Sequence, residues 1–241
     1  MRILILGGTR EARELAGRLV ALGHEVTTSL AGRTQHPTLP AGDLRVGKFG
    51  GVPGLAGYLK AARIERLVDA THPYAGLISI NAVAAARQSG VPLLRLMRPA
   101  WPEPAGAGWR HAAHLAEAAD ALPSGASVLV TTGHEGLETL LGRDDCQLLV
   151  RLIEPPERPL PRHARLLLAR PPHRLEDELA LFRQEGITHL VTKNAGGEAT
   201  AAKLVAAREV GAVVVMIARP VYGPAREVGT VEAAVAAVAG G

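Results

Sequence analysis

The amino-acid sequence predicts an α/β protein of two Rossmann-like domains, each a parallel sheet with helices on both faces. Short apolar runs alternate with Ala-rich segments of helical periodicity, the pattern of repeated βα units. The stretches 64–99 and 187–220 share one order of features: apolar strand, polar turn, Ala-rich helix, strand, Arg-Pro. Between them, Pro99 to Gly108 contains three prolines and two glycines, which is typical of a linker. We therefore expect two domains, 1–108 and 109–241, with a ligand cleft between them lined by the turns that follow the strands.

The elements expected in the first half follow from short runs of Val, Ile and Leu, which predict strands, and from apolar residues at helical spacing. The first helix should stop at Gly23 and the third at Gly90, because glycine commonly ends helices. The expected strands are Ile3–Leu6, Glu25–Thr28, Leu44–Val46, Leu67–Ala70 and Leu93–Met97, and the expected helices are Arg10–Leu22, Leu55–Ala62 and Leu77–Ser89.

The second half continues the alternation, interrupted by a Pro- and Arg-rich region from Glu154 to Arg174. A final Ala-rich helix is expected to begin near Thr230, a candidate N-cap residue. The other expected strands are Ser127–Val130, Cys146–Ile153, His189–Thr192 and Val213–Ile217, and the other expected helices are Ala112–Ala121, Leu137–Leu141, Leu175–Gln184 and Ala201–Val210.

The composition limits the possible classes of protein. Hydrophobic residues make up 47% of the chain and aromatic residues 3%, so the core must consist mainly of Leu, Val, Ile and Ala. The single cysteine, Cys146, excludes an intrachain disulfide, and no apolar run is long enough to span a bilayer; we expect a cytoplasmic protein without a membrane partner. Arginine outnumbers lysine by 23 to four, which reflects either a GC-rich coding bias and a solvated surface or an anionic ligand. Nucleic acid is disfavoured, because no basic stripe is interleaved with aromatic residues.

The turn Gly7-Gly8-Thr9 joins the first strand to the first helix and is a candidate site for the pyrophosphate of a nicotinamide cofactor. It lacks the full G-x-G-x-x-G pattern, so a simple tight turn is the alternative. The second strand ends without the Asp or Glu that would hold a ribose 2′-hydroxyl, and Ser29 and Arg33 stand there instead. A hydroxyl and a guanidinium suit a 2′-phosphate, which favours NADPH over NADH. The alternative is that Arg33 is only a solvated loop residue.

The polar turn Asp69-Ala-Thr-His-Pro-Tyr-Ala75 follows the fourth strand. An ordinary histidine titrates near neutral pH, and a tyrosine can donate a hydrogen bond, so His72 and Tyr74 are candidates for chemistry. The structural alternative is that Asp69 caps a helix, that the proline stiffens the turn and that His72 is a satisfied structural histidine.

Two polar turns occupy the equivalent strand ends of the second half, Thr131-Thr-Gly-His134 and Lys193-Asn-Ala-Gly-Gly197. No H-E-x-x-H pattern, G-x-S-x-G elbow or P-loop lysine is present, so metal-dependent, serine-hydrolase and ATP-dependent chemistry are not indicated. Charge runs are usually solvated, but several arginines that line a cleft would favour a ligand with several carboxylates. The arginines of this half concentrate in one region as Arg151, Arg158, Arg162, Arg165, Arg170, Arg174 and Arg183.

Four motifs together resemble one known family, the precorrin-6A reductases of cobalamin biosynthesis. They are Ile5-Leu-Gly-Gly-Thr-Arg-Glu-Ala-Arg13, Val68-Asp-Ala-Thr-His-Pro-Tyr-Ala75, Leu94-Arg-Leu-Met-Arg-Pro-Ala-Trp101 and Thr192-Lys-Asn-Ala-Gly-Gly197. The resemblance covers essentially the whole chain, and the run from Asp69 to Ala75 is its most specific part. We assign no family role to the Arg-rich region around Arg158 to Arg174, where the resemblance is weakest.

The resemblance implies an NADPH-dependent oxidoreductase. The hydride would go to one carbon of a double bond in the precorrin-6A macrocycle and a proton to the neighbouring carbon, giving the dihydro product. The substrate would be an anionic tetrapyrrole with acetate and propionate side chains, and the partners would be other enzymes of the same pathway; no metal site is expected. The expected cofactor-binding residues are Gly7, Gly8, Thr9, Ser29, Arg33 and Thr71, the substrate-binding residues His72, Tyr74, Thr132, Gly133, His134, Lys193 and Asn194, and the catalytic residues His72, Tyr74 and Lys193.

Two other functions compete with this hypothesis. A non-catalytic module that binds a dinucleotide and regulates a partner would share the first half, but it would not need a second domain with polar strand-end turns. A two-domain nucleotide-sugar enzyme would be expected to place nucleotide contacts in the C-terminal half, where the sequence shows no specific signal.

Overall fold

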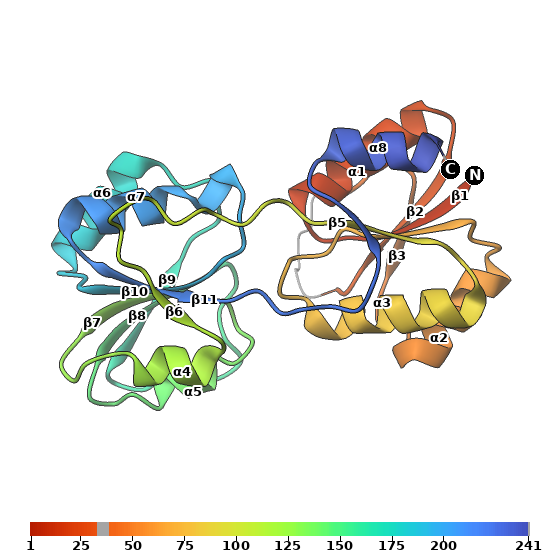
Figure 1. Ribbon diagram of the computed structural model, residues 1–241. Helices are drawn as coiled ribbons and strands as arrows, with labels where there is room; N and C mark the ends of the chain where they lie inside the picture. The colour runs from red at the N-terminus through yellow and green to blue at the C-terminus, as the bar shows by residue number, and fades with distance from the viewer. Residues whose placement is uncertain (33–38, 241) are drawn as a thin grey trace. The chain divides into compact units, whose positions relative to one another are not determined.

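The structure, a computed structural model that describes residues 1–32 and 39–240, divides into two compact units (Figure 1). Unit 1 contains residues 1–99 and the C-terminal segment that begins at Pro220, and unit 2 contains residues 100–219. Each unit is one parallel sheet with helices on both faces, so the predicted fold class is confirmed. No helix within the described ranges is long and apolar enough to cross a membrane.

The sheet of unit 1 has, among the described residues, six parallel strands in the order β3-β2-β1-β4-β5-β12. The chain runs outward from β1 to β3 and then returns to place β4 beside β1, so the strand order reverses between β1 and β4. Ligands of open α/β sheets bind at the carboxyl ends of the strands at such a reversal. The strands are β1 (Arg2–Leu6), β2 (Glu25–Leu30), β3 (Asp43–Val46), β4 (Arg66–Asp69), β5 (Leu93–Leu96) and β12 (Arg226–Val228).

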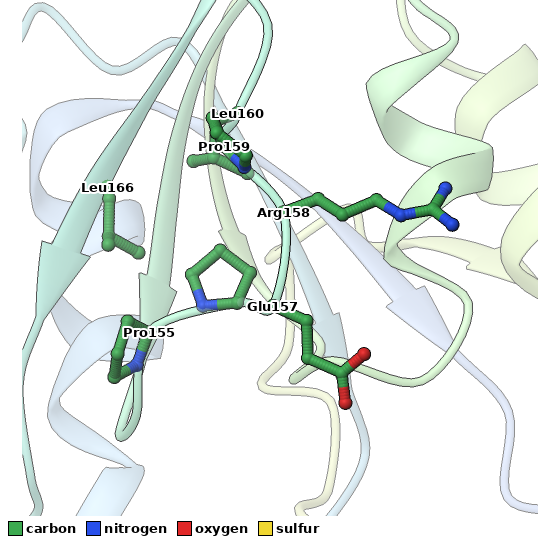
Figure 2. A pocket seen from close by; sticks show the side chains of 7 residues that line it. Pro155, Glu157, Arg158, Pro159, Leu160 and Leu166 are labelled. Atoms are coloured by element: carbon green, nitrogen blue, oxygen red, sulfur yellow. The ribbon is translucent and has the colours of Figure 1, made fainter.

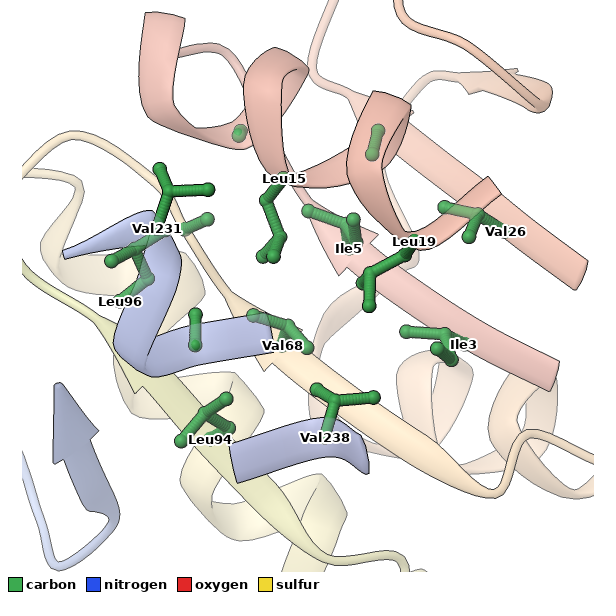
Figure 3. Close-up of a cluster of buried hydrophobic side chains, with 14 of the residues drawn as sticks. Ile3, Ile5, Leu15, Leu19, Val26, Val68, Leu94, Leu96, Val231 and Val238 are labelled. Atoms are coloured by element: carbon green, nitrogen blue, oxygen red, sulfur yellow. The ribbon is translucent and has the colours of Figure 1, made fainter. Parts of the chain in front are cut away.

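The helices of unit 1 are α1 (Arg10–Ala21), α2 (Gly51–Ala61), α3 (Gly76–Ser89) and α8 (Val231–Ala239). Side chains of a strand point alternately to the two faces of the sheet, and β1 divides the core accordingly. Ile3 and Ile5 pack under α1 and α8, which lie side by side, and form the cluster shown in Figure 3. Leu4 and Leu6 pack against α2 and α3 on the other face. Because β1 is buried on both faces, its sequence is a continuous apolar run.

Unit 2 repeats this sheet, with the described strands in the parallel order β9-β8-β7-β10-β11-β6. Leu129, Leu190 and Met216 pack against the Phe182 ring beneath two of its helices, α6 and α7. The helices are α4 (Leu115–Asp120), α5 (Leu137–Leu141), α6 (Leu175–Gln184) and α7 (Ala202–Val210), with a short 3-10 turn at Glu198–Thr200. The strands are β6 (Arg110–Ala112), β7 (Ser127–Thr131), β8 (Gln147–Leu152), β9 (Ala164–Leu168), β10 (His189–Lys193) and β11 (Val213–Ile217).

The last strand and helix of the chain, β12 and α8, belong to unit 1 although the rest of that unit is formed by residues 1–99. After β5 the chain enters unit 2, where β6 pairs with β11 and leads into α4. After β11 it returns to unit 1, where β12 pairs with β5 and leads into α8. The predicted second domain, 109–241, is therefore corrected: its last strand and helix belong to unit 1. The physical reason is that β12 satisfies the open edge of β5, while Val231 and Val238 of α8 close the core over β1.

The sequence does not predict three edge strands, β6, β9 and β12. Two of them are only three residues long and mostly charged or polar, and β9 lies inside the Pro- and Arg-rich region. The helix expected from Ala112 is instead β6 followed by a short helix, because His114 forms the N-cap by accepting a hydrogen bond from the Glu117 N–H. Beside β9, the proline-rich loop 155–160 and Leu166 line a shallow hollow that contains none of the predicted site residues (Figure 2).

Candidate active site

The turn after β1 has the backbone geometry of an anion site. Gly7 lies so close to β2 that a Cβ atom there would be 2.7 Å from the Thr28 Cγ2 atom. Gly8 has a φ of +113°, which favours glycine, and a Cβ there would meet no described atom within 4 Å. The turn thus borders open space and leads into the N-terminus of the 12-residue helix α1, where backbone N–H groups and the helix dipole attract anions.

The hydroxyl of Thr9 both accepts and donates a hydrogen bond within unit 1. As the N-cap of α1 it accepts a hydrogen bond from the Ala12 N–H over 3.0 Å, and it donates one to the Ala70 carbonyl over 2.8 Å. The second bond joins the turn after β1 to the turn after β4, across the point where the strand order reverses. Thr9 can therefore contribute to an anion site only through its backbone, whereas its side chain holds the two turns together.

At the carboxyl end of β2, the buried Ser29 lies opposite Arg45 of β3 in the parallel register. The Arg45 Nη1 atom is 3.4 Å from the Ser29 Oγ atom and donates a 2.6 Å hydrogen bond to the Gly47 carbonyl. The guanidinium lies 3.7 Å from the centre of the Phe49 ring, which fixes its plane. The sequence prediction missed Arg45; its signal is the pairing of β2 with β3, which aligns it with Ser29. The predicted Arg33 lies outside the described residues.

The turn after β4 is shaped by the carboxylate of Asp69, which is buried at the strand end. Its Oδ1 atom accepts hydrogen bonds from the Thr71 N–H over 3.3 Å and from the Thr71 hydroxyl over 2.7 Å. The Thr71 hydroxyl also lies 3.3 Å from the Ser79 Oγ atom of α3. Asp69 does not cap α3, whose N-cap residue is Ala75, so the helix-capping alternative is wrong and the carboxylate instead holds Thr71 in place.

His72 and Tyr74 extend from this turn in different environments. His72 is exposed, and its Nδ1 atom accepts a hydrogen bond from the Tyr74 N–H over 3.2 Å, which leaves the proton of a neutral ring on Nε2. The Tyr74 ring is buried, with its centre 5.9 Å from that of the imidazole. The two predicted residues are therefore neighbours, with one ring open to solvent and the other packed in the protein.

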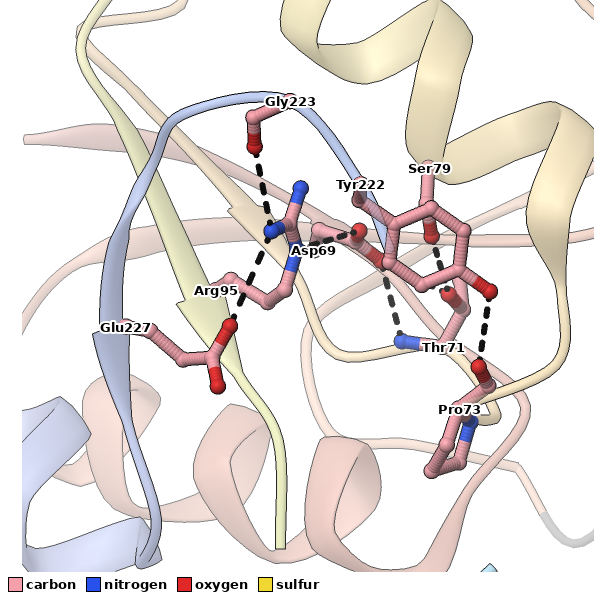
Figure 4. A network of polar contacts seen from close by, with 8 residues as sticks. All are labelled: Asp69, Thr71, Pro73, Ser79, Arg95, Tyr222, Gly223 and Glu227. Carbon is pink, nitrogen blue, oxygen red and sulfur yellow. Dashed lines mark hydrogen bonds and ion pairs between the residues drawn. The ribbon is translucent and has the colours of Figure 1, made fainter. Parts of the chain in front are cut away.

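Arg95 of β5 holds the turn after β4 against the C-terminal segment (Figure 4). Its Nε atom lies 3.4 Å from the Asp69 Oδ2 atom, and its Nη1 atom lies 3.4 Å from the Gly223 carbonyl and 3.7 Å from a Glu227 carboxylate oxygen. The side chain is 4% exposed and that of Asp69 2%, so the pair is buried. From the same segment, the Tyr222 hydroxyl donates a 2.7 Å hydrogen bond to the Pro73 carbonyl.

Arg98, which follows β5, places a cation beside the start of α1. Its Nη1 atom is 3.0 Å from the Glu11 Oε2 atom in the first turn of that helix. A small hollow at this strand edge is lined by Thr9, Glu11, Thr71, Pro73, Leu96 and Arg98. The structure therefore brings the predicted Thr9 and Thr71 together and adds Arg98, which sequence reasoning did not select. Its signal is its place as the second residue after a strand, the same place that Arg219 has after β11.

In unit 2, Thr132, Gly133 and His134 follow β7, and Lys193 and Asn194 lie at the end of the neighbouring β10. The Thr132 side chain is buried, and its Oγ1 atom makes no hydrogen bond within the described part of the chain. Gly133 has a φ of +78°, so the chain turns sharply there, and His134 is exposed. Burial lowers the pKa of Lys193, while the nearby Glu135 raises it. The structure thus groups these predicted residues at one strand edge of unit 2.

The Asn194 side chain forms hydrogen bonds to the backbone of Trp101. Its Oδ1 atom accepts a 2.8 Å hydrogen bond from the Trp101 N–H, and its Nδ2 atom donates a 3.2 Å bond to the Trp101 carbonyl. The Trp101 indole N–H donates to the Gly197 carbonyl over 2.9 Å, and Arg219 donates to the Asn194 carbonyl over 2.7 Å. Asn194 therefore acts mainly as a brace that fixes the turn carrying Lys193.

No group of three or more metal-ligating side chains occurs among the residues described.

Comparison with known proteins gives one consistent result. The family described as Precorrin-6x reductase CbiJ/CobK matches residues 2–239. A precorrin-6A reductase of Rhodococcus erythropolis is 48% identical over 228 residues, which cover 94% of this chain and 92% of the relative. One of Rhodobacter capsulatus is 44% identical over 229 residues, covering 94% and 91%.

Two further comparisons bear on the fold and on the substrate. A solved structure described as CobK precorrin-6A reductase has a TM-score of 0.93 and 41% sequence identity, and the match covers 100% of this chain and 96% of that one. A cobalt-precorrin-6A reductase of Priestia megaterium is 28% identical over 232 residues, covering 90% of each chain.

Proposed function

The chain belongs to the precorrin-6x reductase family, and from this membership we propose that it uses NADPH to reduce one double bond of the metal-free precorrin-6A macrocycle. The observation that carries the proposal is the match of the family over residues 2–239, which includes the polar turns after β4, β7 and β10. A reductase needs a reducing cofactor, and NADPH, when bound, supplies the hydride. Membership in a reductase family favours this function over a regulatory module or a nucleotide-sugar enzyme.

Unit 1 offers a fitting place for a dinucleotide. Gly7 and Gly8 provide the close approach, the positive φ and the open space that a pyrophosphate requires, and α1 adds its N-terminal dipole. Thr71 lies at the end of the adjacent β4 and borders the same hollow as Arg98, so we place Thr71 at the nicotinamide end. The pairing of Arg98 with Glu11 keeps a cation beside the pyrophosphate turn and offsets the carboxylate in the first turn of α1.

The 2′-phosphate of NADPH is assigned to Ser29 and Arg45, with Arg33 as the third residue expected from the sequence. The Ser29 hydroxyl and the Arg45 guanidinium lie 3.4 Å apart at the carboxyl end of β2, where Rossmann-like domains hold the adenosine ribose. A guanidinium presents several donors in one plane and suits a phosphate, whereas a carboxylate at this place would repel it.

The substrate is assigned to the turn after β4 and to the two strand-end turns of unit 2. His72 and Tyr74 are the candidate proton donors to the carbon next to the one that receives the hydride. His72 suits this role because its exposed ring holds the proton on Nε2 when neutral, with Nδ1 fixed by the Tyr74 N–H. Lys193 is half-buried, so its ammonium would interact strongly with a substrate carboxylate. Thr132, Gly133 and His134 complete the assignment, and Asn194 contributes by bracing Lys193.

A metal-free substrate is favoured by the sequence identities of the relatives. The two precorrin-6A reductases are 48% and 44% identical to the chain, whereas the cobalt-precorrin-6A reductase of Priestia megaterium is 28% identical. Reduction of a double bond next to a conjugated, protonated ring system needs binding and orientation more than a strong catalytic base.

The test is an anaerobic assay of NADPH oxidation, followed at the absorbance band of NADPH, with purified protein and precorrin-6A. We expect oxidation that depends on precorrin-6A, a dihydro product by mass spectrometry, and a lower rate with either NADH or cobalt-precorrin-6A. No substrate-dependent oxidation of NADPH would contradict the proposal, and a preference for the cobalt substrate would contradict its metal-free part.

A further inference from the structure

A cluster of buried charged side chains lies at the carboxyl edge of the sheet of unit 2, apart from the residues assigned above. It consists of Arg151 near the end of β8, Glu178 in the first turn of α6 and Lys203 in the first turn of α7. Their exposed fractions are 8%, 2% and 6%. Charged residues are almost never buried to this degree unless they are paired, so each of the three needs a partner.

Arg151 and Glu178 satisfy each other. Both guanidinium nitrogens of Arg151 donate to the carboxylate of Glu178, one of them over 3.2 Å, which makes a two-pronged pair. Arg151 also differs from the rest of the Arg-rich region, because the other arginines of that region are exposed, as expected of a solvated face. They are Arg158, Arg162, Arg165, Arg170, Arg174 and Arg183.

Lys203 has no such partner. Within the described part of the chain, Lys203 takes part in none of the hydrogen bonds or ion pairs, and its ammonium contacts the Trp101 ring, whose centre lies 5.3 Å from Nζ. Lys203 lies on the same face of α7 as Ala206 and Ala207, the other buried residues of that helix. The cluster thus holds two cations and one anion, with one positive charge left over.

Stability does not explain why a lysine stands at this position. Burying an unpaired ammonium is costly, and a cation in the first turn of a helix also opposes the helix dipole. Burial and the neighbouring Arg151 lower the pKa of Lys203 to about 7, while Glu178 raises it. The contacts of Lys203 in the fold therefore do not favour the charged form of its amine. The amine also lies at the edge of the sheet where ligands of such folds bind.

We propose that Lys203 is an anion-binding residue of unit 2 that receives one carboxylate group of the substrate. This inference rests on the proposed function, since it takes the ligand to be the carboxylate-rich macrocycle. The site suits a single carboxylate, because one ammonium is left over and the Arg151 guanidinium is already occupied by Glu178. The half-buried Trp101 indole forms the apolar wall beside the amine, and it also fixes the Lys193 turn through Asn194.

The decisive variant is Lys203→Met, which keeps the length and helix propensity of the side chain and removes only its amine. We expect the dissociation constant for precorrin-6A, measured without NADPH by quenching of tryptophan fluorescence, to rise about 10- to 100-fold, the range for one lost charge-assisted hydrogen bond. The dissociation constant for NADPH should change less than about twofold, because a carboxylate and not a cofactor phosphate is the ligand. The midpoint of thermal unfolding should rise or stay unchanged.

A second readout is the pH dependence of binding. A carboxylate beside Lys203 favours the charged amine and raises its pKa, so the wild-type protein should take up a proton on binding precorrin-6A between pH 7 and pH 9. The other groups that face this cluster are Arg151, Glu178, His173 and Asp177; the pKa of His173 is lowered by burial and by Arg151, so His173 stays neutral in this range. Proton uptake, measured by calorimetry in two buffers of different ionisation enthalpy, should be absent in Lys203→Met.

The matched control is Lys60→Met, which removes an exposed lysine from α2 of unit 1 and should leave precorrin-6A binding unchanged. The inference is overturned if Lys203→Met binds precorrin-6A as the wild type does, or if it loses stability and NADPH binding along with precorrin-6A binding, as a purely structural lysine would. Failure of the proposed function has a different signature. In that case the wild-type protein binds precorrin-6A with the expected dependence on Lys203 and oxidises no NADPH.

Discussion

The choice between NADPH and NADH rests, at the scale of single residues, on the side chains at the end of β2. Ser29 and Arg45 come from neighbouring strands and meet only because β2 and β3 pair in parallel register. Arg45 has two structural contacts as well, a hydrogen bond to the Gly47 carbonyl and the stacking on Phe49. A test of its role must therefore separate the recognition of phosphate from the support of the loop.

Arg45→Met is expected to weaken binding of 2′,5′-ADP and of NADPH by about 10- to 100-fold, because a charge-assisted contact to the 2′-phosphate is lost. Binding of NADH should change less than about twofold, since NADH has no group at this position. Isothermal calorimetry measures all three affinities, and Arg87→Met, at an exposed position of α3, is the matched control. Equal losses for NADPH and NADH would mean that Arg45 supports the loop alone.

Lys203 is expected to make the stability of the protein depend on pH. The folded protein holds this amine with a pKa of about 7, below the value of about 10.4 in an unfolded chain, so the unfolded state binds more protons between these limits. The contribution of Lys203 should therefore be unfavourable below about pH 7 and should diminish as the pH rises toward 10. Lys203→Met should raise the free energy of unfolding by about 1–4 kcal/mol at pH 6 and by less at pH 9, measured by urea unfolding at both values. A gain that is the same at both values would contradict the buried cation as its source.

The turn after β4 shows, at the scale of elements, how a site is held in place by residues far away in the sequence. Asp69 positions Thr71, Arg95 neutralises Asp69, and the segment that leads to β12 supplies the partners of Arg95 and of Pro73. The C-terminal segment therefore helps to fix the turn that carries His72.

Arg95→Met is expected to lower the free energy of unfolding by about 3–5 kcal/mol, because it leaves the Asp69 carboxylate buried without a counter-charge. The double variant Asp69→Asn, Arg95→Met should recover part of this loss, since the amide oxygen can still accept the hydrogen bonds from Thr71. Denaturant unfolding of the single and double variants measures the coupling. Strictly additive effects would show that the pair does not act as a unit.

Much of the fold could be predicted because its central strands are continuous apolar runs followed by polar turns. The run Ile3–Leu6 and the glycines after it identify β1 and its turn from local sequence alone. The pairing of β12 with β5 could not be predicted, because a three-residue strand that begins Arg226-Glu227 has neither apolar alternation nor a turn signal. The candidate site shows the same limit: His72 and Thr71 lie in a motif, whereas Arg45 and Arg98 join the site through register and topology.

The return of the C-terminal segment to unit 1 determines, at the scale of the whole molecule, which unit responds to a change in each helix. Thr230 caps α8 by accepting a hydrogen bond from the Ala233 N–H over 3.2 Å, and His114 caps α4 by accepting one from the Glu117 N–H over 3.2 Å. The first helix completes unit 1 and the second completes unit 2, the reverse of their order along the chain.

Thr230→Ala is expected to destabilise unit 1 by about 1 kcal/mol, the usual value of an N-cap, and His114→Ala is expected to destabilise unit 2. Amide hydrogen exchange should report this as faster exchange in β1 and β4 for the first variant and in β7 and β10 for the second. A division at residue 108 would instead place both effects in the second half of the chain. The pattern of hydrogen exchange therefore distinguishes that division from the two units of the structure.

The return of the chain to β5 also has a consequence for synthesis on the ribosome. Translation delivers β1 first, yet the edge of β5 stays unpaired until β12 is made, and the apolar surface over Ile3 and Ile5 is covered by α1 alone until α8 has emerged. Unit 2 receives its last strand earlier, with β11, so the unit that is later in the sequence is the first that can be completed. For most of its translation the nascent chain therefore exposes an unpaired strand edge and an open core in unit 1, the features through which partly folded chains aggregate or are recognised by chaperones.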